Sequence, residues 1–452
     1  MDRRNRIAFL SEHAGPLALL GSEDAGGQNV YVDEVSRNLA HLGYAVDVFT
    51  RATSPETPPV IDWSPGVRLV NLPAGPLEFL PKDRLWPLMP AFCQAFLQFM
   101  RNDGARYDLI HGNFWMSGWV GLELRQRLGI PLVQIFHALG QTKQRHQRAA
   151  DTSPPERIAV EREIVRQADR LIAQCPSEQY ELESDYQADP RRIAVIPSAV
   201  NIERFRPVPR VAARRRIGLE PDGPTVVYVG RMLPRKDIRN IIRAVALLRR
   251  QSDLPLQLLV VGGETVAPDP NATPEIGVLQ QLAAELDISE RVHFYGKRQP
   301  DMLRNFYCAG DVAVTTPWYE PFGLTPLEGM ACGRPVIGAA VGGITFTIQD
   351  GITGRLVPPR NPAALADRLH ELLTRPEQAA AMGQAARARV EREFTWPMVA
   401  RRTAALYQEV LAEYAHRTAD VPERTLGSTV EPERVSAATP ILVELPAHSH
   451  GK

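Results

Sequence analysis

The chain has 452 residues, of which 44% are hydrophobic and 23% are charged, and its 52 Lys and Arg residues balance its 52 Asp and Glu residues. These fractions are typical of a globular protein and exclude a wholly disordered or fibrous chain, and the length suggests two or three domains. Because the formal net charge is zero, no overall field attracts nucleic acid, and we expect no nucleic-acid partner.

The cysteines and the apolar runs indicate the compartment. Four cysteines lie far apart with no C-x-x-C pair, which indicates neither a disulfide framework nor a zinc site. The apolar run near the N-terminus is too short for a signal peptide, and no stretch approaches the ~18 apolar residues of a membrane span. We therefore expect a cytoplasmic protein with reduced thiols and no transmembrane segment.

In the first half of the chain, short apolar runs alternate with amphipathic ones. We expect strands at residues 7–10, 45–49, 108–110, 131–135, 170–173 and 193–196, and helices at 29–42 and 118–128. The segment 201–219 reads as a linker followed by the first helix of the second half. Its basic run, Arg214 to Arg216, we interpret as a solvated helix face.

The second half repeats this alternation. We expect strands at 225–229, 257–261, 292–294, 311–315 and 335–337, and helices at 238–251, 274–286, 326–332 and after Asn361. Alternating strands and helices predict an α/β class of two doubly wound Rossmann-like domains, with a ligand crevice at the carboxyl ends of the strands. The Pro-, Ser- and Thr-rich tail from 418 to 452 we expect to be disordered.

Two features follow strands of the first half. Gly26 and Gly27 precede its first long helix, where amides without a neighbouring Cβ and the helix amino end favour an anion; a plain tight turn is the alternative. His137 stands just past the strand at 131–135. A structural histidine is the alternative there, although its place at a strand end favours the crevice.

A basic loop follows the strand at 225–229. Arg231 and Lys236 are placed to neutralise a diphosphate, Arg as a planar fork and Lys as a point charge. A solvated basic loop is the alternative. We find no dense His, Asp and Glu cluster that argues for a bound metal, so these cations would take its place.

The segment from Glu320 to Glu328 is the most specific. Phe322, Gly323, Leu324 and Thr325 form its loop, whose amides would face hydroxyl or phosphate oxygens. We expect Glu328, in the first turn of the helix, to accept the hydroxyls of a ribose, and Glu320 to face a sugar ring. A capping or surface role for both carboxylates is the alternative.

With these segments the sequence resembles the retaining family 4 glycosyltransferases of the GT-B fold, near the branch of sucrose-phosphate synthases and D-inositol-3-phosphate glycosyltransferases. The matching stretches include AGGQNVYVDEVSRNLAHLGYAVDVFTR, HGNFWMSGWVG, HALGQTK, VGRMLPRKD and PWYEPFGLTPLEGMACGRPVIGAAVGGI. The resemblance implies an acceptor-binding domain at 1–204, a nucleotide-sugar-binding domain at 205–390, and a helix at 391–417 that returns to the first domain.

The resemblance also implies a role for each residue. Those in the catalytic machinery are His137, which bonds the C6 region of the donor sugar, Arg231 and Lys236, which hold the diphosphate, and Glu320, which contacts the sugar. The remaining donor-binding residues are Gly26, Gly27, Arg298 beside the base, Phe322, Gly323, Leu324, Thr325 and the ribose ligand Glu328. Lys82 and Arg157 would contact the acceptor phosphate.

The chain departs from these relatives at four places. Phe114 stands where the inositol-phosphate enzymes carry Tyr, and Ala138 where they carry Thr. Asp237 follows Lys236 where relatives usually have Gly, and its charge would weaken attraction of a phosphate. The segment 197–201 reads Pro-Ser-Ala-Val-Asn in place of the usual Pro-Pro-Gly-Val-Asp.

The expected function is transfer of a hexosyl unit from a nucleotide diphosphate sugar, UDP-glucose or UDP-N-acetylglucosamine, to a sugar, sugar-phosphate or cyclitol-phosphate acceptor. Relatives retain the anomeric configuration by front-face attack with the leaving phosphate as base, so we expect no protein nucleophile. We expect no cofactor and no metal, because the nucleotide sugar is a substrate. The alternatives are a nucleotide-sugar epimerase on this fold and a non-catalytic nucleotide-sugar-binding regulator.

Overall fold

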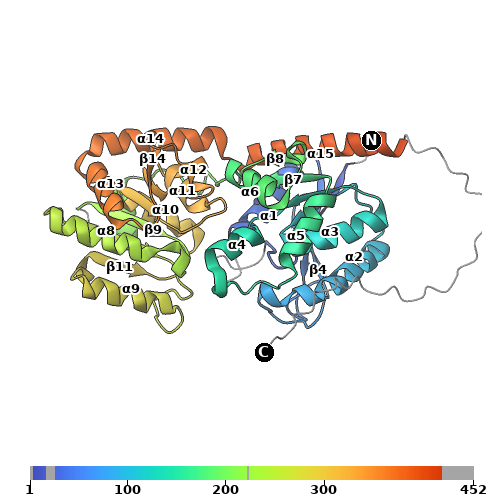
Figure 1. Cartoon of the computed structure of the whole chain (residues 1–452), viewed down its shortest axis with the longest axis horizontal. Coiled ribbons are helices and arrows are strands. Elements are labelled where there is room, and N and C mark those ends of the chain that lie inside the picture. Colours follow the sequence, from blue (N-terminus) through green and yellow to red (C-terminus); the bar gives the residue numbers. More distant parts are fainter. Residues whose placement is uncertain (1–3, 17–25, 221–222, 420–452) are drawn as a thin grey trace, which may run out of the picture. The chain divides into compact units, whose positions relative to one another are not determined.

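The structure is a computed structural model that describes residues 4–16, 26–220 and 223–419. The tail that we expect to be disordered from 418 is helical at residues 418 and 419, and its remainder, 420–452, lies outside the described residues, as do Asp24 and Ala25 before the paired glycines. Residues up to Ala412 group into one compact unit. Within this unit, two separate sheets form, one from each half of the chain (Figure 1).

The first sheet has eight strands in the order β3-β4-β2-β1-β5-β6-β7-β8. Its strands are β1 (Arg6–Leu10), β2 (Ala45–Arg51), β3 (Val60–Ser64), β4 (Val67–Leu72), β5 (Leu109–Asn113), β6 (Leu132–Ile135), β7 (Arg170–Ala173) and β8 (Ile193–Val195). Its helices are α1 (Gly27–His41), α2 (Met89–Asp103), α3 (Trp115–Leu128), α4 (Gly140–Gln147), α5 (Arg157–Gln167) and α6 (Pro176–Tyr186). Neighbouring strands are parallel except β3, which pairs antiparallel with β4 at the edge.

The second sheet has six parallel strands in the order β11-β10-β9-β12-β13-β14. Its strands are β9 (Thr225–Val229), β10 (Gln257–Val261), β11 (Val292–Tyr295), β12 (Val312–Thr315), β13 (Val336–Ala339) and β14 (Gly354–Val357). Its helices are α7 (Arg210–Ile217), α8 (Ile238–Gln251), α9 (Pro274–Glu285), α10 (Pro300–Ala309), α11 (Leu324–Ala331), α12 (Ile344–Thr347), α13 (Pro362–Thr374) and α14 (Pro376–Glu393).

Each sheet is buried between two hydrophobic clusters, one on each face. In the second sheet, α8, α9 and α13 pack on one face, while α7, α10 and α11 pack on the other. In the first sheet, α2, α3 and α5 cover one face and α1 the other. Parallel strands need such cover on both sides, which is why they read as continuous apolar runs. The predicted fold class of two doubly wound α/β domains is confirmed.

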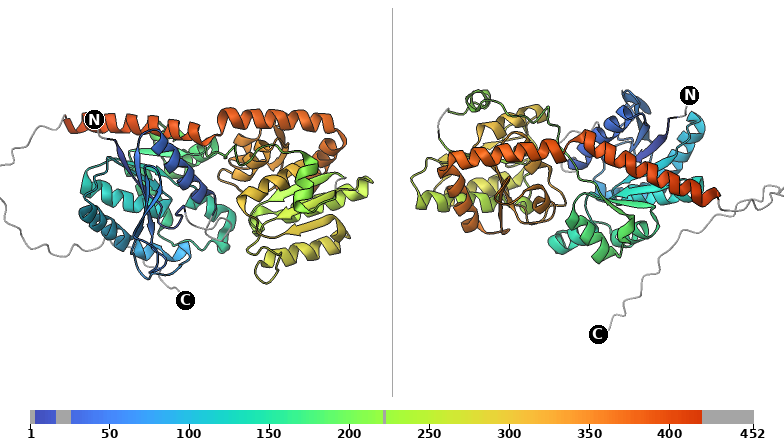
Figure 2. Two further views of the ribbon diagram at one scale, coloured as in Figure 1. Left: turned by 180° about the vertical axis from the view of Figure 1, so that it is seen from behind. Right: turned by 90° about the horizontal axis from the view of Figure 1, so that it is seen from above.

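The face of the first sheet that α1 covers is completed by α15 (Trp396–Ala419), from the far end of the chain (Figure 2). Trp396 and Tyr407 are buried in the same cluster as Ile7 and Phe9 of β1. The hydroxyl of Tyr407 lies 2.5 Å from Nδ1 of His111 in β5. The first lobe therefore takes part of its core from the last described helix. The domain boundaries at 204 and 390 stay predictions.

The solvated-face interpretation of the run in α7 is wrong for Arg214, whose side chain is fully buried. Its guanidinium donates to the carbonyl of Glu220 at 2.8 Å and to that of Gly223 at 3.0 Å. It also donates to Oγ1 of Thr225, the first residue of β9, at 2.9 Å. Arg214 thus fastens α7 to the start of the second sheet, while Arg215 is exposed as expected.

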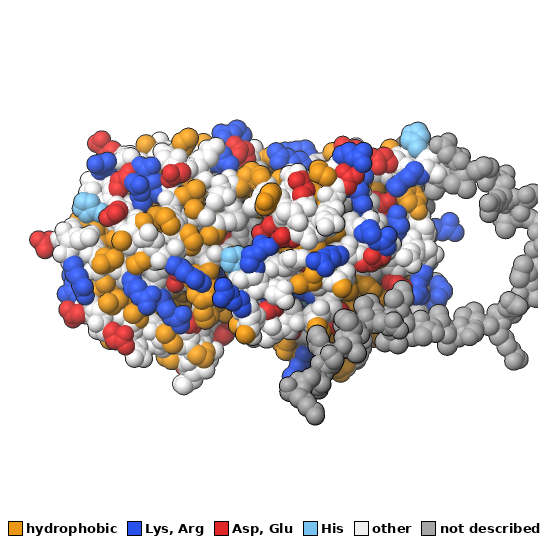
Figure 3. Space-filling model, in the orientation of Figure 1, with side chains coloured by type: hydrophobic (Ala, Val, Ile, Leu, Met, Phe, Trp, Pro, Cys, Tyr) orange, Lys and Arg blue, Asp and Glu red, His pale blue; other side chains and the backbone are white. Residues whose placement is uncertain are grey.

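Acidic and basic side chains are interspersed over the face shown in Figure 3, consistent with a net charge of zero. None of the helices in the described part of the chain has the length and apolar character needed to cross a membrane.

Candidate active site

A cavity of ≈ 430 Å³ is lined by loops that follow strands of both sheets. Both sheets reverse their strand order here: β1 lies between β2 and β5, and β9 lies between β10 and β12. Ligands bind at such switch points because the loops on either side diverge and leave a crevice. The predicted residues in the lining are Gly26, Gly27, Lys82, His137, Arg231, Lys236, Arg298, Glu320, Phe322, Gly323, Leu324, Thr325 and Glu328. Arg157 is not in the lining.

Lys236 and Glu320, from the loops after β9 and β12, form an ion pair. Nη1 of Arg235 lies 3.9 Å from the same Glu320 oxygen. Burial lowers the pKa of Lys236 to about 8, against the opposing effect of the Glu320 charge. For Glu320, burial alone would raise the pKa, but Lys236 and Arg235 outweigh it and hold the pKa below its usual range. Both groups are therefore charged at neutral pH.

Glu328 lies in the second turn of α11 rather than the first, and its carboxylate accepts a hydrogen bond of 2.8 Å from the hydroxyl of Tyr307. Burial raises the pKa of Glu328 to about 7. Gly323 precedes the helix with φ of 88°, a left-handed conformation that favours glycine. A Cβ there would lie 3.1 Å from Cγ of Glu320, so the glycine lets the loop turn tightly between the two carboxylates.

His137 follows β6 and has both ring nitrogens engaged. Nε2 lies 3.0 Å from Oδ1 of Asn113, and Nδ1 lies 3.1 Å from Nε2 of Gln174. Its backbone is left-handed, with φ of 59°. Burial and the nearby His13 lower the pKa of His137 to about 3, so the imidazole is neutral at physiological pH.

The paired glycines open α1, as expected, but they present different groups. The amide of Gly26 donates to the side-chain Oδ1 of Asn29 at 2.9 Å, so this N–H is already engaged within the helix start. A Cβ on Gly27 would lie 3.3 Å from Cδ1 of Leu324 at the start of α11. The lack of a side chain at Gly27 therefore lets the amino ends of α1 and α11 approach each other across the cavity.

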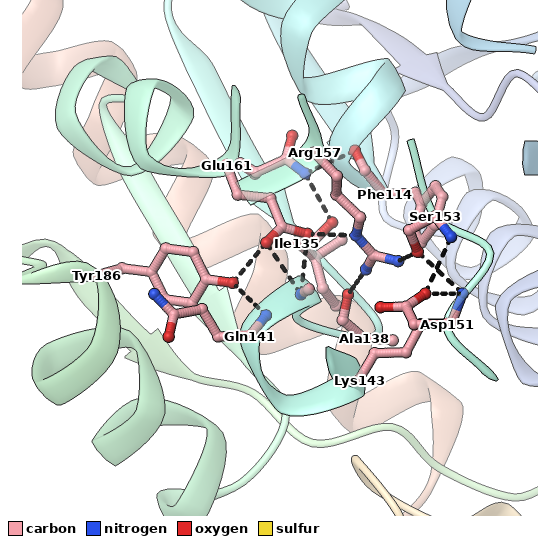
Figure 4. A network of polar contacts seen from close by, with 12 residues as sticks. Phe114, Ile135, Ala138, Gln141, Lys143, Asp151, Ser153, Arg157, Glu161 and Tyr186 are labelled. Carbon is pink, nitrogen blue, oxygen red and sulfur yellow. Dashed lines mark hydrogen bonds and ion pairs between the residues drawn. The ribbon is translucent and has the colours of Figure 1, made fainter. Parts of the chain in front are cut away.

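Arg157 is held inside the first lobe instead of reaching the cavity (Figure 4). Only 3% of its side chain is exposed, and Nε pairs with Glu161 at 2.8 Å. Nη2 donates to the carbonyl of Ala138 at 2.5 Å, and the guanidinium lies 5.0 Å from the ring centre of Phe114. The predicted direct contact with an acceptor phosphate does not fit this placement. Arg157 instead supports two residues that do line the cavity, Phe114 and Ala138.

Two departures from the relatives have a structural explanation. Asp237 has φ of 51°, which explains why glycine suits this position. Its carboxyl is hydrogen-bonded to the side chain of Trp318 and does not line the cavity, so it does not face a bound phosphate there. Asn201 donates to Oε1 of Glu34 on α1 at 3.0 Å, a contact that an aspartate would replace with repulsion.

Sequence reasoning missed His13, which lines the cavity after β1. Its Nδ1 lies 2.7 Å from Oε1 of the buried Glu12, and Glu12 in turn accepts a hydrogen bond from Ser117. The rule that found His137, a histidine just past a strand, would also have found His13. Gln174 and Asn113 were missed because an amide at a strand end carries no comparable signal.

Arg298 and its neighbour Lys297, which the resemblance places in the same loop, both line the cavity, and Nη1 of Arg298 donates to the carbonyl of Val266 at 2.7 Å. Among residues 4–16, 26–220 and 223–419, no group of three or more His, Cys, Asp and Glu side chains is arranged to hold a metal ion.

Comparisons with known proteins agree with this geometry. Residues 26–199 match the glycosyl transferase 4-like domain, and residues 210–389 match the glycosyl transferases group 1 family. The D-inositol 3-phosphate glycosyltransferase of Geodermatophilus obscurus is 41% identical over 379 residues, which cover 82% of this chain and 83% of that one.

Solved structures give the same result. A sucrose-phosphate synthase from Thermosynechococcus elongatus superposes with a TM-score of 0.82 at 38% identity, covering 91% of this chain and 100% of that one. Anabaena HepE in complex with UDP-glucose has a TM-score of 0.69 at 20% identity, covering 89% of this chain and 99% of that one, and shares the fold. The chain therefore belongs to the family 4 glycosyltransferases, enzymes with the GT-B fold.

Proposed function

We propose that this glycosyltransferase moves a hexosyl unit from a UDP-sugar to a phosphorylated sugar or cyclitol, with retention of the anomeric configuration and without a divalent cation. The observation that carries the proposal is the meeting of Arg231 and Lys236 with Glu320 and Glu328 at one switch point. Two cations suit a diphosphate, and two carboxylates on either side of a tight turn suit the hydroxyls of a sugar and a ribose.

The donor assignment also draws on similar proteins. Anabaena HepE, which shares the fold, is described in complex with UDP-glucose. The acceptor class follows the names of two relatives: one is a D-inositol 3-phosphate glycosyltransferase, and the other is a synthase whose product, sucrose phosphate, is a phosphorylated sugar. Lys82 lines the cavity and is the side chain that we assign to the acceptor phosphate.

In the proposed reaction, the bond from the anomeric carbon to the diphosphate oxygen breaks as an acceptor hydroxyl oxygen bonds the same carbon from the same face. The leaving phosphate takes the proton of that hydroxyl. Negative charge grows on the phosphate in the transition state, so Arg231 and Lys236 stabilise it most there. Glu320 binds a sugar hydroxyl; its pairing with Lys236 and Arg235 makes it a poor nucleophile. His137, neutral and bonded at both nitrogens, transfers no proton.

The test combines each of UDP-glucose and UDP-N-acetylglucosamine with inositol 3-phosphate and with fructose 6-phosphate, followed by NMR of the product linkage. We expect one pair to give a product with the anomeric configuration of the donor, at a rate that excess EDTA does not change. An inverted linkage would contradict retention. Loss of activity in EDTA that Mn²⁺ or Mg²⁺ restores would contradict metal independence. A sample with donor alone should return unaltered sugar.

A further inference from the structure

We propose that Asn113 and Gln174 are positioning residues that hold the imidazole of His137 neutral, with its proton on Nε2, beside the transferred sugar. The proposal rests on the proposed function, because it assigns His137 to the sugar end of the donor.

Asn113 fixes one side of the ring. It is the last residue of β5 and is fully buried. Its Nδ2 donates to the carbonyl of Leu10 in β1 at 3.1 Å, which fixes the orientation of the amide. Oδ1 therefore points at Nε2 of His137, 3.0 Å away. Since an amide oxygen only accepts hydrogen bonds, Nε2 must carry the proton.

Gln174 fixes the other side. It follows β7, lines the cavity, and is 4% exposed. Its backbone N–H donates to Oε2 of Glu178 on α6 at 2.6 Å, which holds the residue just before that helix. Nε2 of its side chain lies 3.1 Å from Nδ1 of His137 and donates to it, so Nδ1 is left without a proton. Both nitrogens are then satisfied only in the neutral Nε2–H form.

The surroundings of the ring also favour the neutral form. The ring of Tyr31 on α1 meets it edge to face, with centroids 4.9 Å apart. His13, after β1, and His111, in β5, are ionisable groups near the ring. A positive charge on either would oppose a second positive charge on His137. Glu178, behind Gln174, is the nearby acid, and burial raises its pKa to about 8.

Neutrality matters because the sugar gains positive charge as its bond to the diphosphate breaks. An imidazolium beside the sugar would repel this charge in the transition state, whereas a neutral ring does not. Two cations of the site, Arg231 and Lys236, lie on the loop after β9, which we assign to the diphosphate. Asn113 and Gln174, which together we call the clamp, therefore keep positive charge at the phosphate end of the donor and away from the sugar end.

Gln174→Glu tests the clamp. A carboxylate at this position requires a proton on Nδ1, so His137 becomes charged and its titration moves toward neutral pH. We expect kcat of Gln174→Glu to fall about tenfold for each pH unit below the new pKa, with the KM of the UDP-sugar nearly unchanged. Wild-type kcat should show no such limb between pH 5.5 and 8, to within about twofold.

Gln179→Glu is the matched control, because it makes the same change nearby, on α6, at a side chain that bonds Glu183 outside the cavity. Its pH profile should match the wild type. NMR of the full chain labelled with ¹⁵N-histidine should show His137 as the neutral Nε2–H tautomer in wild type and protonated near pH 6 in Gln174→Glu.

The proposal is overturned if wild-type His137 is the Nδ1–H tautomer or charged at pH 7, or if Gln174→Glu keeps the wild-type profile. Should Gln174→Glu not fold, Asn113→Leu combined with Gln174→Met removes both partners of the ring without adding charge, and the Nδ1–H form should then become detectable; its absence would equally overturn the proposal. The NMR measurement needs no turnover, so failure of the proposed transfer reaction would be seen separately.

Discussion

Lys236 and Glu320 bond each other in the structure, although we assign them to different parts of the donor. Binding of the proposed UDP-sugar would therefore exchange this ion pair: the diphosphate would take Lys236, and the sugar hydroxyls would take Glu320. UDP without its sugar would take Lys236 and leave Glu320 buried with no hydroxyl to replace it, which is costly for a buried charge. In the proposed reaction, the ion pair would thus favour binding of the UDP-sugar over binding of the product UDP.

This exchange predicts opposite effects at the two carboxylates. Glu320→Ala should raise the affinity for UDP, because Lys236 is released, while kcat falls. Glu328→Ala should weaken UDP and UDP-sugar alike, by about 1.5–3 kcal/mol for a lost hydrogen bond to a charged group. Calorimetric titration of both variants with UDP separates the roles. Weaker UDP binding by Glu320→Ala would contradict the exchange.

Substitutions of Lys82 and Arg157, the two cations expected at the acceptor, should have different effects. Lys82→Ala should raise the acceptor KM with little change in the melting temperature, because Lys82 lines the cavity. Arg157→Ala should lower the melting temperature, because it leaves the carboxylate of Glu161 buried without its cation, a cost of about 3–5 kcal/mol. Thermal unfolding and acceptor titrations of the two variants test this. Equal melting temperatures would contradict the structural role of Arg157.

At the scale of single elements, α7 depends on one buried guanidinium. Arg214→Ala should lower the free energy of unfolding by about 1–3 kcal/mol, because carbonyls of the loop before β9 lose their donor. Its neighbour Arg215 is exposed, so Arg215→Ala should stay within about 0.5 kcal/mol of wild type. Urea denaturation of both measures the difference. Similar values for the two variants would show that the hydrogen bonds of Arg214 contribute little to the free energy of unfolding.

The elements that the sequence predicted best are the buried parallel strands. β9, β10 and α8 have the predicted limits, because continuous apolar runs and a clear helical period coincide there. β3, β4 and β14 were missed. β3 is a half-exposed edge strand, β4 carries Arg68 and Asn71 among its apolar residues, and β14 carries Arg355 between apolar residues. Arg214 was misread because periodicity records that a residue is charged but not that distant carbonyls surround it.

In the site, too, some features could be predicted from the sequence and others could not. Loops that follow strands could be predicted, so Arg231, Lys236, Glu320 and Glu328 were found and do line one cavity. The pairing of Lys236 with Glu320 joins residues 84 positions apart, and no sequence spacing reveals it. The burial of Arg157 likewise depends on Glu161 and on the carbonyl of Ala138.

At the scale of the whole molecule, buried histidines link stability to pH. Burial lowers the pKa of His111 to about 3. Below pH ~6.5, the ordinary pKa of histidine, the unfolded chain binds a proton that the folded chain does not. The free energy of unfolding therefore falls as pH falls from 6.5 toward 3, and this contribution is fully present above 6.5. Glu328, whose pKa is raised, changes the free energy of unfolding with pH in the opposite direction. The effect of His111 is therefore measured as the difference in unfolding free energy between the wild type and a variant without this histidine.

His111→Gln should remove this dependence. Relative to the variant, the wild type should lose about 2 kcal/mol of unfolding free energy between pH 7 and pH 5, at up to about 1.4 kcal/mol per pH unit. Urea denaturation at the two pH values gives the difference. His370→Gln, at an exposed position, is the control and should show no such change. A constant difference between wild type and His111→Gln would rule out the linkage.

The packing of α15 against β1 has a consequence for the order in which the protein matures on the ribosome. Ile7 and Phe9 are made first, yet their partners Trp396 and Tyr407 emerge only after the entire second sheet has been synthesised. Until then, α1 alone covers that face of the first lobe, and part of the face stays open while the second lobe folds as its own unit. The amino-terminal lobe is therefore the last to be completed, and a chain that stops short of α15 leaves the ribosome with part of that apolar face exposed.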